Sequence, residues 1–321
     1  MILTVTLNPL LERRLIFNSI LYENENRNGK RELKAGGKGI NVSRQLNNFN
    51  TDNFAFTFLG GNNGKVLKEV LAKEGIKFSF TKMNEETREA FVTVDESKKK
   101  LSNFFSLNSK VSLTEVDEFK NKLEKMIENC EIVVFAGSSP CEEANSVFPY
   151  GIELANRYDK ISICDTYGSH LSNCIECSPT ILHNNILELK KSLNISLNDE
   201  KDKLDFLDYL YGKNIKQSFL TDGDKDTFAS NFDYHYKIEN PAIDVYDAIG
   251  SGDCFVAGVA YSWHNNLTFE ECLALASSLG ICNAKSYDVC NVKPSEAEEV
   301  KPLVKIASTG KKMKTINVTP Q

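Results

Sequence analysis

The segment DAIGSGDCFVAG, residues 247–258, places two glycines, a hydroxyl and a carboxylate directly before an apolar stretch. That stretch has the spacing of one buried helix face, at Val256, Val259, Ala260 and Trp263. The free N–H groups and the dipole at such a helix start favour an anion. The carboxylate of Asp253 would repel that anion. Its position is explained if the carboxylate is needed for chemistry on a group that is brought to the anion. An ordinary glycine turn with an acidic residue in the first helical turn also explains the pattern.

A second glycine-rich helix start lies far away in the chain, in AGGKGINVSRQLNNF at residues 35–49. Neither cluster fits G-x-G-x-x-G, because Val42 and Phe255 stand where the third glycine is required. Neither cluster fits the P-loop pattern, which weakens the case for a P-loop NTPase as well as for a Rossmann dehydrogenase. Two anion-binding helix starts therefore indicate one site for a phosphorylated substrate and a nucleotide.

Apolar runs that alternate with helical patterns must position these groups. The runs are residues 2–7, 53–60, 131–137, 160–166, 179–184 and 217–223. Strands that are apolar on both faces and alternate with helices are typical of a parallel sheet covered by helices on both sides. The sequence thus predicts an α/β core, with a mostly helical last third from about residue 252 to 308.

A second group of strands has mixed polar and apolar residues, which is typical of half-solvated antiparallel strands. The segments are RRLIFNSIL, GKRELKA, IKFSFTKM, EAFVTVDE and KLSNFFSLN. They fall into two blocks, residues 12–34 and 77–107, which we expect to form one small sheet that acts as a lid. The core then comprises residues 1–11, 35–76 and 108–310, followed by a C-terminal tail at 311–321.

Charge and composition narrow the class of protein. The 321 residues carry a formal net charge of −6, which argues against a nucleic-acid surface. No apolar run approaches the length of roughly 18 residues that spans a membrane, and MILTVTLNP does not resemble a signal peptide, so we expect a cytoplasmic protein. Nine cysteines with a lone C-x-x-C favour reduced thiols over a zinc site.

Three motifs, in this order along the chain, resemble the PfkB or ribokinase-like carbohydrate kinases: TLNP, AGGKGINVSR and DAIGSGDCFVAG. The sequence looks most similar to the branch with 1-phosphofructokinase and tagatose-6-phosphate kinase. The branch features are TVTLNP, Asn26-Arg27, Lys38 and ETREAFV with Arg88, and FAGSSP and HNNILEL also match family segments. The resemblance implies a ribokinase-like three-layer fold with a mostly parallel sheet and a small β lid. Because a single thin sheet cannot bury the apolar area of its mixed strands, we also expect two lids to pack together as a homodimer.

The resemblance also implies roles for the glycine loop and for the N-x-x-E segment. Asp253 is expected to be the general base, and Gly250, Ser251 and Gly252 to form the anion hole. Asn185 and Glu188 are expected to organise Mg²⁺ through water, and ATP to contact Asn185, Thr221, Gly223 and Asn283. Asn185 and Glu188 could instead simply cap a helix.

For the acceptor, the resemblance implies a sugar pocket with Glu12, Gly37, Asn41 and Ser138. Arg27, Lys38 and Arg88 are expected to bind the phosphate already on the sugar. Solvated surface positions are the alternative for Arg27 and Arg88.

Some positions depart from the family pattern, and together they leave the sugar specificity open. Glu12 replaces a family aspartate and is followed by Arg13 and Arg14, and His183-Asn184 replaces lysine-proline. The segment SSPCEE is also altered. We therefore expect an ATP-dependent kinase of a ketohexose phosphate, with fructose 1-phosphate as the first substrate and tagatose 6-phosphate as the second. A sugar-phosphate sensor without turnover and a kinase of unphosphorylated sugars or nucleosides are the alternatives.

Overall fold

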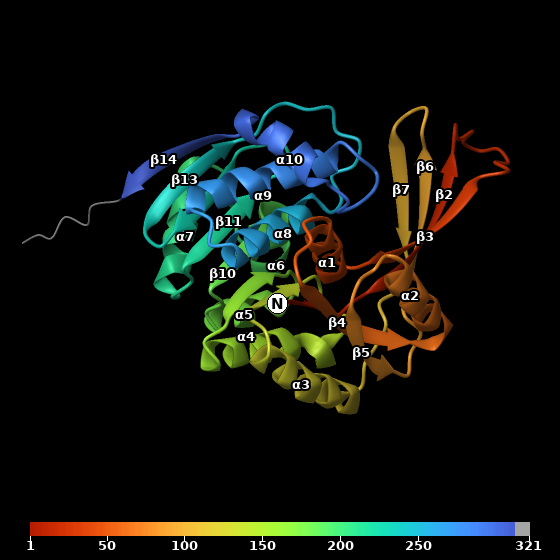
Figure 1. The fold of residues 1–321 in the computed structure, drawn as a ribbon, viewed down its shortest axis with the longest axis horizontal. Coiled ribbons are helices and arrows are strands. Elements are labelled where there is room, and N and C mark those ends of the chain that lie inside the picture. The colour runs from red at the N-terminus through yellow and green to blue at the C-terminus, as the bar shows by residue number, and fades with distance from the viewer. Residues whose placement is uncertain (312–321) are drawn as a thin grey trace, which may run out of the picture.

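The computed structural model describes residues 1–311, and a ten-stranded sheet forms its centre (Figure 1). In spatial order its strands are β14 (Lys305–Lys311), β13 (Tyr234–Glu239), β12 (Thr227–Asn231), β11 (Gln217–Thr221), β10 (Ile181–Asn185), β9 (Ile161–Asp165), β8 (Ile132–Ala136), β1 (Ile2–Thr6), β4 (Asn53–Gly60) and β5 (Phe78–Met83). The pairs from β11 to β5 are parallel, and those from β11 to β14 are antiparallel. The predicted mostly parallel sheet is confirmed.

Helices cover both faces of this sheet. They are α1 (Lys38–Asn48), α2 (Gly61–Lys73), α3 (Leu113–Glu128), α4 (Val147–Arg157), α5 (Leu171–Glu176), α6 (Ile186–Leu193), α7 (Glu200–Gly212), α8 (Ser251–His264), α9 (Phe269–Ala284) and α10 (Pro294–Val300), with short 3₁₀ turns at Glu142–Ser146 and Lys301–Leu303. In β8, Val133 and Phe135 pack toward α3 and α4, whereas Ile132 and Val134 pack toward α1, α8 and α9. This period of two in a fully buried strand produces the two apolar cores of a three-layer fold.

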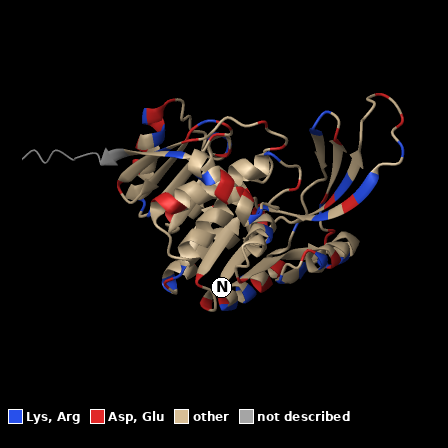
Figure 2. Cartoon of the chain, turned by 45° about the horizontal axis from the view of Figure 1, so that its top comes forward, with Lys and Arg blue, Asp and Glu red and all other residues tan. Residues whose placement is uncertain are grey.

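The lid is a separate four-stranded sheet beside the core (Figure 1). Its order is β3 (Lys30–Gly36), β2 (Leu10–Phe17), β6 (Glu89–Asp95) and β7 (Lys100–Phe105). The predicted small sheet built from two separate segments is confirmed, but β2 and β6 run parallel, so the expectation of a wholly antiparallel lid is wrong. Figure 2 shows acidic and basic residues interspersed on its strands.

One predicted lid strand belongs to the core instead. The segment IKFSFTKM forms β5, which pairs in parallel with β4 at the edge of the large sheet. Edge strands are only partly covered, so their mixed polarity resembles that of a lid strand, and residues 77–107 are not all lid.

The chain end also differs from expectation. The last third is mostly helical, as predicted, but β14 follows the helices and closes the antiparallel edge of the sheet. Of the expected tail at 311–321, Lys311 ends β14 and the rest lies outside the described residues. Across residues 1–311, no helix combines the length and the apolar character that a membrane span requires.

Candidate active site

The glycine loop begins α8 as predicted. Gly250 caps the helix with φ of 81°, and a methyl group there would lie only 2.2 Å from Val289 Cγ1. Both the left-handed backbone and this close approach require glycine. The first turn of α8 therefore presents the N–H groups that an anion hole needs.

Asp253 is buried in that first turn and faces the other glycine-rich helix. Asn41 of α1 donates a hydrogen bond of 2.7 Å to Asp253 Oδ2. Burial raises the pKa of Asp253 to about 6; Lys38 opposes this shift, and the negative charge of Asp165 adds to it. A carboxyl group with this pKa is ionised at neutral pH, yet it is more basic than an exposed aspartate, which suits a general base.

Lys38 lies with acidic groups near this base. Its Nζ is 2.9 Å from Glu188 Oε1 and 3.3 Å from Asp165 Oδ1, and it lies 5.1 Å from the centre of the Tyr167 ring. Burial opposes the charge on Lys38, but Asp165 and Glu188 outweigh burial and raise its pKa. Lys38 is therefore a cation close to Asp253, and its direct partners are carboxylates, whereas Arg27 lies in an exposed loop beside Glu25.

Asp165 is a site residue that the sequence analysis missed. It ends β9, is fully buried, and lies 2.9 Å from His183 Nδ1 through Oδ1. Burial opposes its ionisation, but Lys38 and His183 lower its pKa to about 2. The available signal was an aspartate at the carboxyl end of a predicted parallel strand, the edge at which such sheets bind ligands.

Two carboxylate oxygens in this group are buried without a hydrogen-bond partner, Asp165 Oδ2 and Glu188 Oε2. Hard, charged oxygens of this kind fit Mg²⁺, although no cluster of three or more acidic, histidine or cysteine ligands occurs within residues 1–311. Asn185 caps α6, since its Oδ1 accepts from Leu187 N at 2.8 Å. The capping interpretation thus describes Asn185, whereas Glu188 points toward Lys38.

Arg88 and Ser138 come together through shared contacts with Asn8. Asn8 Nδ2 donates to both Ser138 Oγ and Asn108 Oδ1 at 3.0 Å, and Arg88 donates to Asn108 Oδ1 and to the Asn8 carbonyl. Arg88 Nε is buried without a partner, and burial lowers the pKa of this guanidinium. An incompletely bonded arginine among amides and a hydroxyl is a suitable site for an anion.

A cleft of about 520 Å³ begins at this group. Ser138, Tyr167 and Ser169 are among the residues that line it. Lys38 lies over the ring of Tyr167, so this cation is next to one of the residues of the cleft wall.

Arg27 is far more exposed than expected. Its side chain is 78% exposed and pairs with Glu25 in the polar loop between β2 and β3. The solvated alternative describes Arg27 within this subunit.

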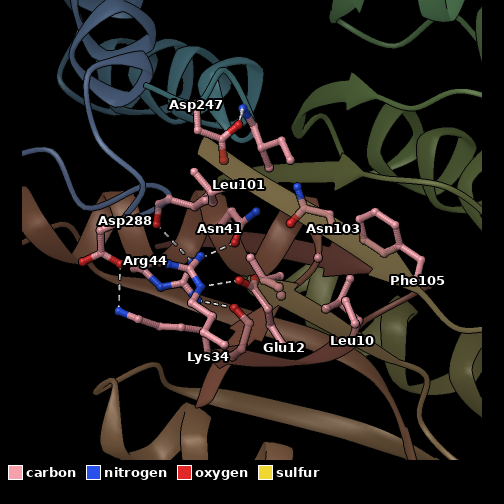
Figure 3. Close-up of a pocket in the computed structure, with 18 residues that line it drawn as sticks. Leu10, Glu12, Lys34, Asn41, Arg44, Leu101, Asn103, Phe105, Asp247 and Asp288 are labelled. Carbon is pink, nitrogen blue, oxygen red and sulfur yellow. Dashed lines mark hydrogen bonds and ion pairs between the residues drawn. The ribbon is translucent and has the colours of Figure 1, made fainter. Parts of the chain in front are cut away.

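Three expected sugar-pocket residues line one cavity of about 80 Å³ between lid and core, namely Glu12, Gly37 and Asn41 (Figure 3). Gly37 caps α1 with φ of 123°, and a methyl group there would meet Thr6 Cγ2 at 2.7 Å. The space is well below the roughly 300–1,000 Å³ of typical ligand pockets, so it is too small for a sugar in this position of the lid.

The expected nucleotide residues are spread over three environments. Thr221 ends β11 with Oγ1 3.3 Å from His183 Nε2, and Gly223 lies in an open turn with φ of 63°. Asn283 is buried in α9, where it donates to the Ile249 carbonyl and to Ser251 Oγ. Asn283 therefore braces the anion-hole loop from behind.

The comparisons with known proteins agree with this geometry. The model of the pfkB family of carbohydrate kinases matches residues 8–296. Tagatose-6-phosphate kinase of Staphylococcus epidermidis is 31% identical over 287 residues, which cover 88% of this chain and 92% of that protein.

Two solved structures share the fold. A possible 1-phosphofructokinase of Thermotoga maritima has a TM-score of 0.86 and 22% identity, over 97% of this chain and 100% of that one. Escherichia coli phosphofructokinase-2 with fructose-6-phosphate has a TM-score of 0.82 and 20% identity, over 94% of this chain and 98% of that one. The chain belongs to the pfkB family of carbohydrate kinases, so it is an enzyme that transfers phosphate to an alcohol group of a carbohydrate.

Proposed function

We propose that this kinase transfers the γ-phosphoryl group of ATP to a hydroxyl of a ketohexose phosphate. The observation that carries this proposal is the partly unpaired Arg88, which is linked through Asn8 to Ser138 in the wall of the cleft, where Tyr167 lies beside Lys38. A neutral sugar gives no reason for a half-buried guanidinium with an unpaired Nε beside the cleft. A substrate phosphate there would leave the acceptor hydroxyl near Asp253.

In the proposed reaction, Asp253 accepts the proton of the acceptor hydroxyl. The hydroxyl oxygen then forms a bond to the γ-phosphorus while the bond to ADP breaks. The N–H groups at Gly250, Ser251 and Gly252 stabilise the charge on the transferring group. Asn41 holds Asp253 in place through its 2.7 Å hydrogen bond.

The proposed role of Lys38 differs from binding the substrate phosphate, which the resemblance implies. Its ammonium group lies between Asp165 and Glu188 and acts electrostatically on Asp253, so it is placed to offset charge on the transferring phosphoryl group. Arg88 is then the principal cation for the substrate phosphate.

Mg²⁺ would be held near Glu188 and Asp165, whose unpaired oxygens fit it, and would neutralise charge on the triphosphate. ATP is proposed to reach these groups past Thr221 and Gly223, at the carboxyl end of β11.

The order in which the candidate substrates should be tested differs from the order expected from the sequence. The side chains of the pocket do not favour fructose 1-phosphate over tagatose 6-phosphate. The relative with 31% identity is named for tagatose 6-phosphate, which supports that sugar as the first substrate to test and fructose 1-phosphate as the second.

An assay of ADP release tests the proposal. It compares tagatose 6-phosphate, fructose 1-phosphate and fructose 6-phosphate with fructose, tagatose and ribose. We expect kcat/KM for at least one ketohexose phosphate to exceed that of every unphosphorylated sugar by about 100-fold, the effect of two charge-assisted contacts. Preference for an unphosphorylated sugar, or binding without turnover, would reject it.

A homodimer through the lids is also proposed. The register places Phe91 opposite Phe104 and Arg13 on the lid face that points away from the cavity, with Leu15 two residues further along β2. Leu15, Phe91 and Phe104 are 42%, 49% and 60% exposed. An apolar patch on a thin sheet is typical of an interface. Escherichia coli phosphofructokinase-2 has been solved as a tetramer in an inhibited form, and here sedimentation would measure the assembly.

A further inference from the structure

Arg14 is an unusual residue for the inner face of a lid. It is an arginine in the middle of β2, and its side chain is only 2% exposed. Because strand positions i and i+2 share a face, Arg14 lies beside Glu12 in the cavity between lid and core. A buried arginine needs partners for its charge and its donors, and these partners indicate its role.

The first partner is Glu12, the residue that departs from the family pattern in the sugar pocket. Arg14 Nε donates to Glu12 Oε1, so the longer carboxylate is held by a neighbour on its own strand. A glutamate side chain has one more rotatable bond than an aspartate side chain. Without the contact to Arg14, the carboxylate of Glu12 would therefore be less precisely positioned. The pair restricts Glu12 to one position at the cavity wall.

The second partner is in the core. Arg14 Nη1 donates to the Tyr287 carbonyl at 2.9 Å, in the loop at residues 285–293 between α9 and α10. Lys34 of β3 pairs with Asp288 of the same loop at 2.8 Å, as Figure 3 shows. The Tyr287 ring packs on the lid residues Ile16, Val92 and Val94. The lid is thus attached to this loop at three adjacent points.

The same loop touches the anion hole on its other side. Cys290 Sγ lies 3.3 Å from the Gly250 carbonyl, and Val289 packs against Gly250 so closely that no side chain fits there. Asn283 accepts from Cys290 N and donates to Ser251 Oγ. One short segment therefore contacts the lid arginine and the glycine of the phosphoryl-transfer loop.

We propose that Arg14 is a positioning residue for the sugar, which fixes Glu12 in the pocket and ties the lid to the loop behind the anion hole. Its effect on the substrate passes through Glu12, and its effect on the loop passes through the Tyr287 carbonyl. The kinetic part of this inference rests on the proposed function, whereas the tie between lid and loop does not.

The kinetic test compares Arg14→Met, which keeps much of the apolar stem, with Arg13→Met as a matched control. Arg13 is the neighbouring arginine, but it pairs with Glu89 on the opposite face of the lid. We expect Arg14→Met to raise KM for the sugar phosphate about tenfold, the effect of one charge-assisted contact, with KM for ATP within about twofold. Arg13→Met should leave both constants near those of the wild type.

A double variant separates positioning from a general loss of structure. Glu12→Gln with Arg14→Met removes both charged partners, so it leaves no unpaired buried charge and should fold. If Arg14 acts through Glu12, KM of the double variant is no higher than that of Glu12→Gln alone. Effects that multiply, or an Arg14→Met enzyme that matches Arg13→Met, would overturn the proposal.

Hydrogen exchange of the ligand-free enzyme tests the tie without any assumption about substrate. Arg14→Met should speed exchange at residues 285–291 at least tenfold relative to Arg13→Met. The double variant should show the same increase, because it and Arg14→Met both lack the hydrogen bond to the Tyr287 carbonyl. Unchanged exchange refutes the tie. If exchange rises but the wild type uses no sugar phosphate, the proposed function fails while the tie stands.

Discussion

The proposed phosphoryl-transfer end of the site and its proposed sugar end differ in what fixes the positions of their side chains. At the first end, helix starts and a buried hydrogen bond hold Gly250, Asp253 and Asn41 in positions set by the backbone. At the second, Arg88 depends on partners from distant segments, and Glu12 depends on Arg14 of its own strand, which is itself bound to the distant Tyr287 carbonyl. Chemistry at the first end should therefore respond to changes of single atoms, whereas the sugar end should tolerate change at some cost in affinity.

The largest effect is expected at Asp253. Asp253→Asn keeps the size of the side chain and can still bond to Asn41, but it cannot accept a proton. We expect kcat to fall about 10²–10⁴-fold with KM for the sugar nearly unchanged, as for the loss of a general base. Steady-state kinetics with a thermal melt measure this, and a variant with near-normal kcat would remove Asp253 from that role.

Lys38 distinguishes the two ends directly. If Lys38 acts on the transferring group, Lys38→Met lowers kcat by about 10²-fold, as other lost electrostatic contacts to a transition state do, with KM for the sugar phosphate within a few-fold. If Lys38 instead binds the substrate phosphate, as the resemblance implied, KM rises and kcat stays. The split between the two constants decides which end it serves.

The pH dependence of kcat/KM tests the role of Asp253 without a mutation. Asp253 must be ionised to accept a proton, and its pKa is raised to about 6 by burial. We expect kcat/KM to be constant above neutrality and to fall tenfold per pH unit below about 6. Because burial favours the protonated form, the contribution of this carboxyl to the stability of the fold increases as the pH falls from 6 to 4. A thermal melt at pH 5 is therefore the control that separates loss of activity from unfolding. A profile that is flat down to pH 5 would contradict this role.

The smallest effect on activity is expected at the outer face of the lid. Phe91→Ser with Phe104→Ser removes the two most exposed aromatic rings of the patch, far from Asp253. We expect the dimer to dissociate at micromolar concentration, because buried aromatic anchors dominate interfaces. Sedimentation measures this, and a wild-type protein that is already monomeric would reject the interface.

The difference between groups fixed by the backbone and side chains fixed by their partners also explains which features the sequence could predict. Glycine loops at Gly37 and Gly250 could be found because backbone conformation demands glycine, and apolar runs located the core strands. The residues of β5 predict a lid strand, because the polarity of an edge strand resembles that of a solvated sheet.

The partners of long side chains were harder to predict. Lys38 and Arg27 are both cations near family motifs, yet one is buried between two carboxylates and the other is exposed beside Glu25. Asp165 and Arg14 gain their positions from contacts with residues 18 or more positions away. Only the fold brings those partners together.

The most direct test of the account concerns Arg88. We would measure kcat/KM of the wild type and of Arg88→Ala for the preferred ketohexose phosphate, for the same sugar without phosphate, and for ATP. The account predicts a loss of about tenfold or more for the sugar phosphate alone, the effect of one charge-assisted contact, with the other two values nearly constant. Equal losses for all three, or no loss for the sugar phosphate, would contradict the assignment of a phosphorylated substrate.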